Sequence, residues 1–320
     1  MATGTGRRLA TLSTLLLLSG ACTRDPVGPT ADTTPPPTAD TSGAPSPPMS
    51  VLLVVDDSDS MLPLVESLAV GLDAVEASLP DDARIGVITT DVERHQGALL
   101  GRGMVEGPER IEQIRQILLC EATCFEGPVA EDPDHMCGEP LGSVISRQYL
   151  DCECGEDQWL GHCGTAVEEG LEAVFLALCR ASEQAPAACT ESVDTGEQSL
   201  PPLLLPSDLG TQPALIDERV VVPVFLSDEG NTSRRLEHEE VATLYLELFA
   251  LAGVELAFGA VLPEMKGGQL ICPGTSTEWA VRRYLDAVER TRGAAVSIHE
   301  DCELENIAEA MVDALRGTVP

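Results

Sequence analysis

Continuously apolar runs alternate along this chain with segments of helical periodicity, and this alternation restricts the fold more than any other feature. Residues 50–55 (SVLLVV) are apolar apart from the first and are followed by two aspartates, as is typical of a strand buried on both faces. The next segment, 61–79, instead has its leucines and valines three or four residues apart, on one face of a helix. Because the alternation continues to the C-terminus, we predict a doubly wound α/β fold, a mostly parallel sheet with helices on both faces.

Later segments repeat this pattern, with two interruptions. Residues 120–163 are rich in Cys, Gly, Asp and Glu, and residues 185–217 contain several prolines, so we interpret both as insertions. The folded domain therefore spans residues 50–318 and carries a Cys-rich insertion. Further strands are expected at 83–90, 218–226, 254–262 and 294–298, with a short edge strand at 97–105, and further helices at 108–119, 165–180, 237–252, 278–291 and 304–315.

The composition allows a large core and argues against one class of partner. Hydrophobic residues make up 43% of the 320 residues and aromatic residues 3%, so the core must consist mainly of Leu, Val, Ile and Ala. The formal net charge of −34 excludes nucleic acid as a partner, because phosphate binding needs a basic surface. Most carboxylates are expected to solvate the surface, and the charge is compatible with cation binding.

The first 22 residues look like an export signal rather than part of the fold. Two arginines precede a short apolar run, residues 9–19, which is too short to span a bilayer. The following SGAC sequence resembles the lipobox of bacterial lipoproteins, although an aliphatic residue is more usual than Ser19. The resemblance implies that Cys22 is diacylated and that the protein is exported and lipid-anchored to the bacterial outer membrane or cell surface. The alternative is an ordinary signal peptide cleaved nearby, with Cys22 left free.

Residues 23–49 form a segment of a different kind. They consist largely of Pro, Thr, Asp, Ala and Gly, with too few apolar side chains to build a core. Such a composition favours a disordered tether with polyproline II character. A lipid anchor, a tether and a folded domain together suit a protein displayed on a membrane surface.

Carboxylate and hydroxyl side chains follow two of the predicted strands at the point where each strand ends. The first strand leads into residues 56–60 (DDSDS), and the strand at 218–226 leads into residues 227–230 (SDEG). A third segment, residues 163–165 (CGT), precedes a predicted helix. Because ligands of such sheets bind in loops after the carboxyl ends of the strands, we expect the three segments to meet at one edge of the sheet.

Together the three segments resemble the metal-ion-dependent adhesion site of von Willebrand factor type A domains. The family pattern has Asp-x-Ser-x-Ser after the first strand, a threonine five residues before a glycine (here Gly170) at a central helix, and an aspartate after the next central strand. The sequence departs from the pattern at Asp59, where a small neutral residue is commoner, and at Glu229, which separates the aspartate from Gly230. The resemblance covers residues 50–318 and implies five metal ligands, namely Asp56, Ser58, Ser60, Thr165 and Asp228.

The chemistry of these five side chains points to a hard cation. They offer oxygen, with neither sulfur nor imidazole, and such sites suit Mg²⁺, Mn²⁺ or Ca²⁺. Three of the five are neutral hydroxyls, so the cation can still attract an anionic ligand, which in the family is often a carboxylate of the partner protein. The extra charge of Asp59 favours Ca²⁺. The alternative is that Ser58 and Ser60 merely cap the following helix.

The cysteines indicate disulfides. Ten of the 11 remain once Cys22 is assigned to the lipid, and an even number in an exported chain is typical of disulfide pairing. Cys272 and Cys302 lie in predicted loops and are the only two in the last third of the chain, so we predict that they pair with each other. Six others lie within the insertion, where the alternative to disulfides is a zinc cluster of His135, Cys137, Cys152, Cys154, His162 and Cys163.

The sequence contains no recognisable pairing of a nucleophile with a base, and its five histidines are scattered. The tripeptide Asn231-Thr232-Ser233 matches a glycosylation sequon but is interpreted as an ordinary turn. We therefore predict a non-enzymatic, cell-surface module that binds a protein partner through a divalent metal, which is an adhesion function. Two alternatives stay open: a metal-dependent enzyme or accessory subunit of an envelope enzyme complex, and a structural domain whose metal site is empty.

Overall fold

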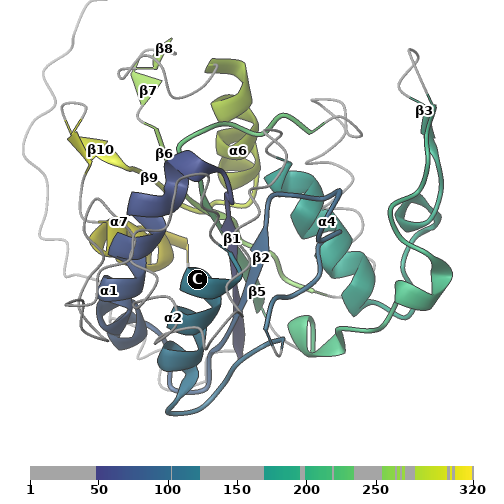
Figure 1. Cartoon of the computed structure of the whole chain (residues 1–320), viewed down its shortest axis with the longest axis horizontal. Coiled ribbons are helices and arrows are strands. Elements are labelled where there is room, and N and C mark those ends of the chain that lie inside the picture. The colour runs from purple at the N-terminus through teal and green to yellow at the C-terminus, as the bar shows by residue number, and fades with distance from the viewer. Residues whose placement is uncertain are drawn as a thin grey trace, which may run out of the picture. The chain divides into compact units, whose positions relative to one another are not determined.

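A five-stranded parallel sheet forms the centre of the computed structural model (Figure 1). Its strands are β1 (Met49–Val55), β2 (Arg84–Thr89), β5 (Val220–Leu226), β6 (Gly259–Leu262) and β9 (Ala295–Ser297), in the spatial order β2-β1-β5-β6-β9. Every pairing between neighbours in this sheet is parallel, as predicted. All residues of β1 and β5 are buried, because both strands are covered on both faces.

Several predictions fall on residues outside the described part of the chain. They concern the signal peptide with Cys22, nearly all of the tether, most of the Cys-rich insertion, Thr165, the helix at 237–252, and the pair Cys272 and Cys302. The structure describes residues 48–101, 103–122, 169–194, 199–217, 220–233, 254–263, 265–266, 269–270, 278–300, 303–304 and 307–318.

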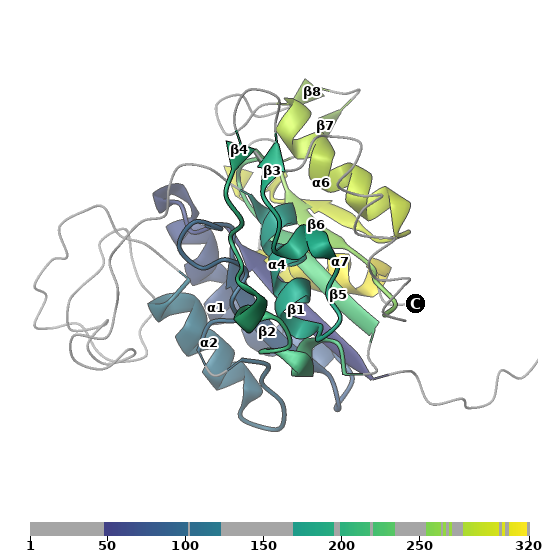
Figure 2. The same cartoon turned by 90° about the vertical axis from the view of Figure 1, so that its right-hand side faces the viewer.

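Helices cover both faces of the sheet (Figures 1 and 2). One face carries α1 (Leu62–Ser78), α2 (Arg110–Cys120) and α7 (Ile307–Thr318), and the other carries α4 (Gly170–Ala181) and α6 (Glu278–Arg290). Each corresponds to a helix predicted from periodicity, although α4 begins later than expected and α7 is displaced toward the C-terminus. Within the described ranges, none of the helices is long and apolar enough to cross a membrane. The arrangement confirms the α/β class.

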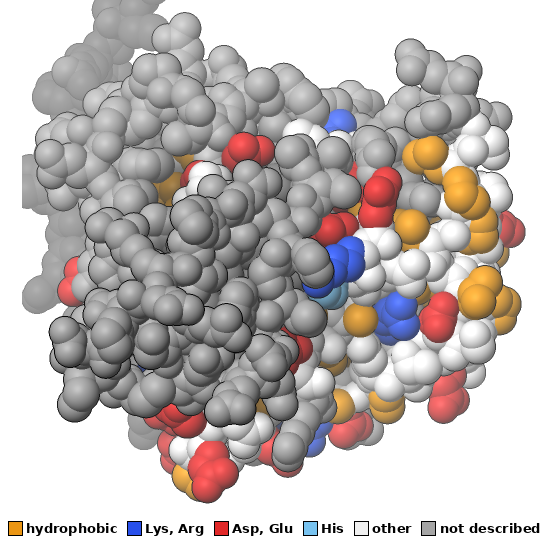
Figure 3. All heavy atoms as spheres, viewed as in Figure 1, with side chains coloured by type: hydrophobic (Ala, Val, Ile, Leu, Met, Phe, Trp, Pro, Cys, Tyr) orange, Lys and Arg blue, Asp and Glu red, His pale blue; other side chains and the backbone are white. Residues whose placement is uncertain are grey.

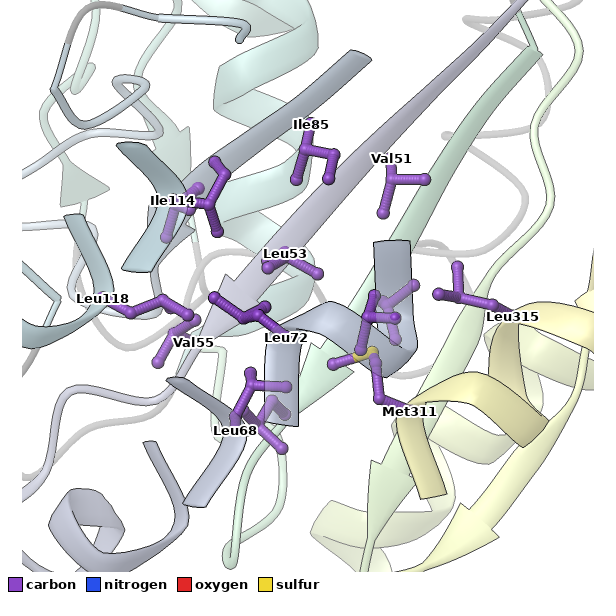
Figure 4. Close-up of a cluster of buried hydrophobic side chains, with 14 of the residues drawn as sticks. Val51, Leu53, Val55, Leu68, Leu72, Ile85, Ile114, Leu118, Met311 and Leu315 are labelled. Atoms are coloured by element: carbon purple, nitrogen blue, oxygen red, sulfur yellow. The ribbon is translucent and has the colours of Figure 1, made fainter. Parts of the chain in front are cut away.

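The face covered by α1, α2 and α7 has an aliphatic core (Figure 4). Val51, Leu53 and Val55 point to this face because successive side chains of a strand alternate between its two sides. Figure 4 shows them next to Leu68 and Leu72 of α1 and to side chains from β2, α2 and α7. Among the described residues, this cluster includes methionines but no aromatic side chain, in line with the low aromatic content of the chain.

The opposite face holds a small group of aromatic side chains. Phe225 of β5 stacks on Phe258, with ring centroids 5.4 Å apart, and meets Tyr284 of α6 at 4.3 Å. All three are buried, with exposed fractions of at most 1%. In a chain with five Phe, three Tyr and two Trp, this grouping concentrates much of the aromatic surface at the contact between β5 and α6.

Pro223 lies in the middle of β5, where a proline cannot donate a hydrogen bond to the ladder. Val221, two residues earlier, exchanges backbone hydrogen bonds with the segment preceding β6, and regular pairing with β6 begins again at Val224. Since alternate residues of a strand bond to the same neighbour, the missing N–H of Pro223 lies on the β6 side. The strand predicted at 254–262 is consequently regular over 259–262 alone.

The prediction of an edge strand at 97–105 is wrong, because the described residues of this segment form no regular strand. Val105 forms one antiparallel bridge with Ile85 of β2, and Leu100 N–H donates to Val87 O at 2.9 Å, but the other described residues of the segment form turns, bends or irregular backbone. Gly97, Gly101 and Gly103 have φ values of +67°, +59° and +95°. These left-handed conformations suit glycine and interrupt an extended strand.

The stretch at 185–217, predicted as irregular, contains short elements in its described part. A disulfide between Cys179 of α4 and Cys189 ties it to the C-terminal end of α4, and Gln212 N–H donates to Arg180 O at 3.0 Å. Cys120, at the end of α2, is also disulfide-bonded. The short elements are η2 (Ala187–Cys189), β3 (Val193–Asp194), β4 (Ser199–Leu200), η3 (Pro206–Asp208) and η4 (Pro213–Leu215); later short pairs are β7 (Met265–Lys266) with β8 (Gln269–Leu270), and β10 (His299–Glu300) with β11 (Glu303–Leu304).

Candidate functional site

The order of the strands brings two of the predicted ligand loops together. From β1 the chain passes to β2 on one side and then crosses to β5 on the other side of β1. In open parallel sheets, the crevice at such a reversal, at the carboxyl ends of the strands, is where ligands bind. Val55 and Leu226 are paired in register, so the loops that follow β1 and β5 leave the sheet side by side.

Asp56 anchors the loop after β1 to the loop after β5. Its side chain is fully buried, and its carboxylate accepts hydrogen bonds from both loops. Ser58 N–H donates to Oδ1 at 2.9 Å, and Ser227 Oγ donates to Oδ2 at 2.6 Å. Ser227 was not singled out from the sequence. Through Ser227 the loop after β5 holds Asp56. The only sequence feature that could have indicated this role is the position of Ser227 directly before Asp228.

The hydroxyls of Ser58 and Ser60 lie between the two aspartates. Ser58 Oγ and Ser60 Oγ are 3.0 Å apart, and Ser60 Oγ donates to Asp228 Oδ1 at 3.3 Å. Asp228 is held in turn by its backbone N–H, which lies 3.2 Å from Met61 Sδ. Four of the five predicted ligands, from segments about 170 residues apart, are thus joined by hydrogen bonds.

The serines do not act as caps of the helix that follows them. The N-cap residue of α1 is Met61, and this end of the helix has no side-chain cap hydrogen bond. A short 3-10 turn, η1 (Asp59–Met61), precedes the helix instead. Ser58 and Ser60 use their hydroxyls toward each other and toward Asp228, which leaves the capping alternative without support at α1.

Thr165, the fifth predicted ligand, lies outside the described residues, and the start of α4 is the nearest described point. Glu169 N–H donates to Thr90 O at 3.3 Å, and Thr90 N–H donates to Val55 O at 3.0 Å. The first turn of α4 therefore lies next to the carboxyl ends of β2 and β1. α4 begins at Gly170, five residues after Thr165 in the sequence.

The carboxyl groups of the second loop are perturbed by burial and by one another. Burial raises the pKa of Asp228 to about 6, with the Asp56 carboxylate adding to the effect and the Ser60 hydrogen bond opposing it. Burial likewise raises the pKa of Glu229 to about 7, and the carboxylates of Asp56 and Asp228 add to it. Carboxylates crowded in a partly dry site are electrostatically unfavourable, and a bound cation would reverse this.

A second buried carboxyl group, Asp57, lies next to the site and had no predicted role. Burial raises its pKa to about 7, with Asp91 and Asp56 adding to the effect and Arg94 opposing it. Thr90 Oγ1 is 3.4 Å from Asp57 Oδ1. The apolar run before Asp57 signals its burial, but nothing in the sequence pairs it with Asp91.

We expect the metal-free protein to lose stability as the pH rises from about 5 to about 8, because the folded-state pKa of Asp57, about 7, lies above the ordinary value for aspartate. The folded state then binds this proton more tightly than the unfolded state, and the stabilisation is lost as the pH passes the folded-state pKa. Urea unfolding in EDTA at both pH values tests this. Asp57→Asn should reduce the difference between the two pH values, and an equal difference in wild type and variant would contradict the assignment.

The donor set fits a hard cation. Asp56, Ser58, Ser60 and Asp228 present carboxylate and hydroxyl oxygens, the ligands preferred by Mg²⁺, Mn²⁺ and Ca²⁺. Within the described ranges, no group of three or more His, Cys, Asp or Glu side chains is placed to hold a metal ion. The expected site has two carboxylates and three hydroxyls, so it differs in kind from such a group.

Comparisons with known proteins add no family assignment. No model of a known protein family matches the chain, and no curated protein is similar to it in sequence. The site must therefore be interpreted from its own geometry and chemistry.

Proposed function

We propose that this protein is a von Willebrand factor type A-like module that binds a protein partner through a divalent cation, and that it is not an enzyme. One observation carries the proposal. The buried carboxylate of Asp56 and the carboxylate of Asp228 come from loops far apart in the sequence, and the hydroxyls of Ser58 and Ser60 lie between them. This set lies at the strand-order reversal, where parallel sheets bind their ligands.

In this proposal Asp56, Ser58, Ser60 and Asp228 hold the cation, with Thr165 as a further ligand. The neighbouring carboxylates favour a divalent ion, because like charges that repel one another are neutralised when it binds. The neutral hydroxyls contribute coordination without charge. The two carboxylates balance the formal charge of a divalent ion, but a coordination position that the protein leaves open can still bind an anionic oxygen of the partner.

The proposed partner group is a carboxylate, and the charge of the chain opposes its approach at long range. The formal net charge is −34, and acidic side chains are spread over the described part of the face in Figure 3. Charges on the surface are screened over about 8 Å at physiological salt, so this repulsion acts weakly on a group that reaches the cation. The local attraction then decides the binding.

Calorimetric titration of the purified protein with Mg²⁺, Mn²⁺ and Ca²⁺ tests the proposal directly. We expect saturable binding of at least one of these cations at millimolar concentration or below. A pull-down from the native envelope should recover the partner in the presence of that cation, lose it in EDTA, and recover it when the cation is restored. A protein that binds none of the three cations would overturn the proposal.

We further propose that the protein is exported and anchored by lipid at Cys22 to the outer membrane or cell surface. The disulfide between Cys179 and Cys189 supports an oxidising compartment, where such bonds persist. Replacing Cys22 with serine should move the protein from the membrane fraction to the soluble fraction, because the acylated residue is lost. Cell fractionation followed by immunoblotting measures this, and identical fractionation of variant and wild type would refute the anchor.

A further inference from the structure

One short loop connects the proposed metal site to the first turn of α4. This loop, residues 227–233, follows β5. At its start, Ser227 and Asp228 contact residues of the loop after β1. At its end, Asn231 and Ser233 contact α4. The same short loop thus contacts both the loop after β1 and the first turn of α4.

Asn231 caps α4 from a distant part of the sequence. Its side chain is fully buried, and Oδ1 accepts a hydrogen bond from Leu171 N–H at 3.0 Å. The first amides of a helix have no acceptor within the helix. At α4 the N-cap residue, Glu169, makes no side-chain cap hydrogen bond, so Asn231 supplies the acceptor that the local sequence does not.

Two further contacts hold the same end of the loop. Ser233 Oγ donates to Glu172 Oε2 at 3.0 Å, and both residues are buried. Arg283 of α6 donates from Nη1 to Ser233 O at 3.0 Å and to Asn231 O at 3.4 Å. The loop is therefore fixed between α4 and α6, with Asn231 providing the bond to the helix backbone.

The two polar atoms of the Asn231 side chain differ in their hydrogen bonding. Nδ2 is buried and makes no hydrogen bond with any residue in the described part of the chain. A buried donor without an acceptor destabilises the folded state, so the contribution of this side chain comes through Oδ1. Complete burial also leaves no room for a glycan on the Asn231-Thr232-Ser233 sequon.

We propose that Asn231 is a positioning residue for the metal site. By holding loop 227–233 against the first turn of α4, it fixes the position of Asp228 relative to the end of α4 that follows Thr165. It acts through these groups and does not itself touch the cation. The inference rests on the proposed metal-binding function and adds a residue that the adhesion-site pattern described above does not contain.

Calorimetric titration with Mg²⁺ tests this on the full chain. Asn231→Ala should weaken binding about 10-fold, the effect typical of losing a residue that orients a metal ligand. Asn231→Asp keeps the acceptor and should bind at least as tightly as wild type. Leu315→Ala, in the aliphatic core on α7, controls for loss of stability and should leave the Mg²⁺ affinity unchanged while lowering the melting temperature. Wild-type affinity in Asn231→Ala, or equal weakening in Asn231→Asp, would overturn the inference.

Hydrogen exchange in EDTA separates this inference from the proposed function. Asn231→Ala should exchange faster at the amide of Leu171 and also at those of Asp228 and Glu229, which bond to Met61 Sδ and Ser227 Oγ. Unchanged exchange at Asp228 and Glu229 overturns the linkage, even in a protein that binds Mg²⁺. Faster exchange there, in a protein whose wild type binds no cation, supports the linkage and overturns the metal site instead.

Discussion

Replacing Asp56 with asparagine should weaken divalent-cation binding at least about 100-fold, because a buried carboxylate ligand loses its charge. Asparagine keeps the volume of the side chain and an oxygen that accepts from Ser58 N–H. Ser227 Oγ can turn its hydroxyl to accept from the new amide nitrogen. The fold should therefore survive, and the loss should appear in calorimetric titration with Mg²⁺, Mn²⁺ and Ca²⁺ and in the pull-down of the partner.

Asp313→Asn is the matched control for this experiment. It makes the same chemical change on α7, where the side chain is 65% exposed and pairs with Arg316 at 3.6 Å. Such an exposed pair contributes little, so we expect neither the cation affinity nor the stability to change measurably. If Asp56→Asn binds cations as tightly as Asp313→Asn does, Asp56 is not a ligand and the proposed site is wrong.

The fold could be predicted because the sequences of its central strands are continuous apolar runs. The runs that form β1 and β5 are buried along their whole length, so their apolar sequences alone were enough to predict burial on both faces. The edge strand predicted at 97–105 did not form, because three glycines there adopt left-handed conformations. The pair Cys179 and Cys189 was also not predicted, since spacing does not determine disulfide connectivity.

The candidate site was predictable in part for a similar reason. Acidic and hydroxyl residues directly after buried strands mark the carboxyl edge of the sheet, and among them the resemblance to the adhesion-site pattern implied Asp56, Ser58, Ser60 and Asp228. The contacts that orient these side chains could not be predicted from the sequence. The hydrogen bond from Ser227 to Asp56 spans 171 residues, and the cap that Asn231 gives α4 spans 60. Such pairs depend on how the elements pack, and no local pattern encodes them.

The largest expected effect on stability belongs to Phe225, the central ring of the aromatic group on the α4 and α6 face. It is fully buried and contacts both Phe258 and Tyr284. Phe225→Ala should lower the free energy of unfolding by about 3–5 kcal/mol, because it removes a large apolar surface and leaves a cavity that a packed sheet cannot close. Phe225→Leu fills most of that space and should cost less.

Urea unfolding with the disulfides intact measures these differences, with Val70→Ala as the control. Val70 lies on α1 with an exposed fraction of 61%, so its truncation should change the free energy of unfolding by no more than about 0.5 kcal/mol. Phe225 precedes Asp228 by three residues on the same strand and loop, yet it faces the core and not the site. Cation affinity measured well below the unfolding transition should therefore persist in Phe225→Leu. A change below about 1 kcal/mol in Phe225→Ala would mean that the aromatic contacts add little to the packing of β5 against α6.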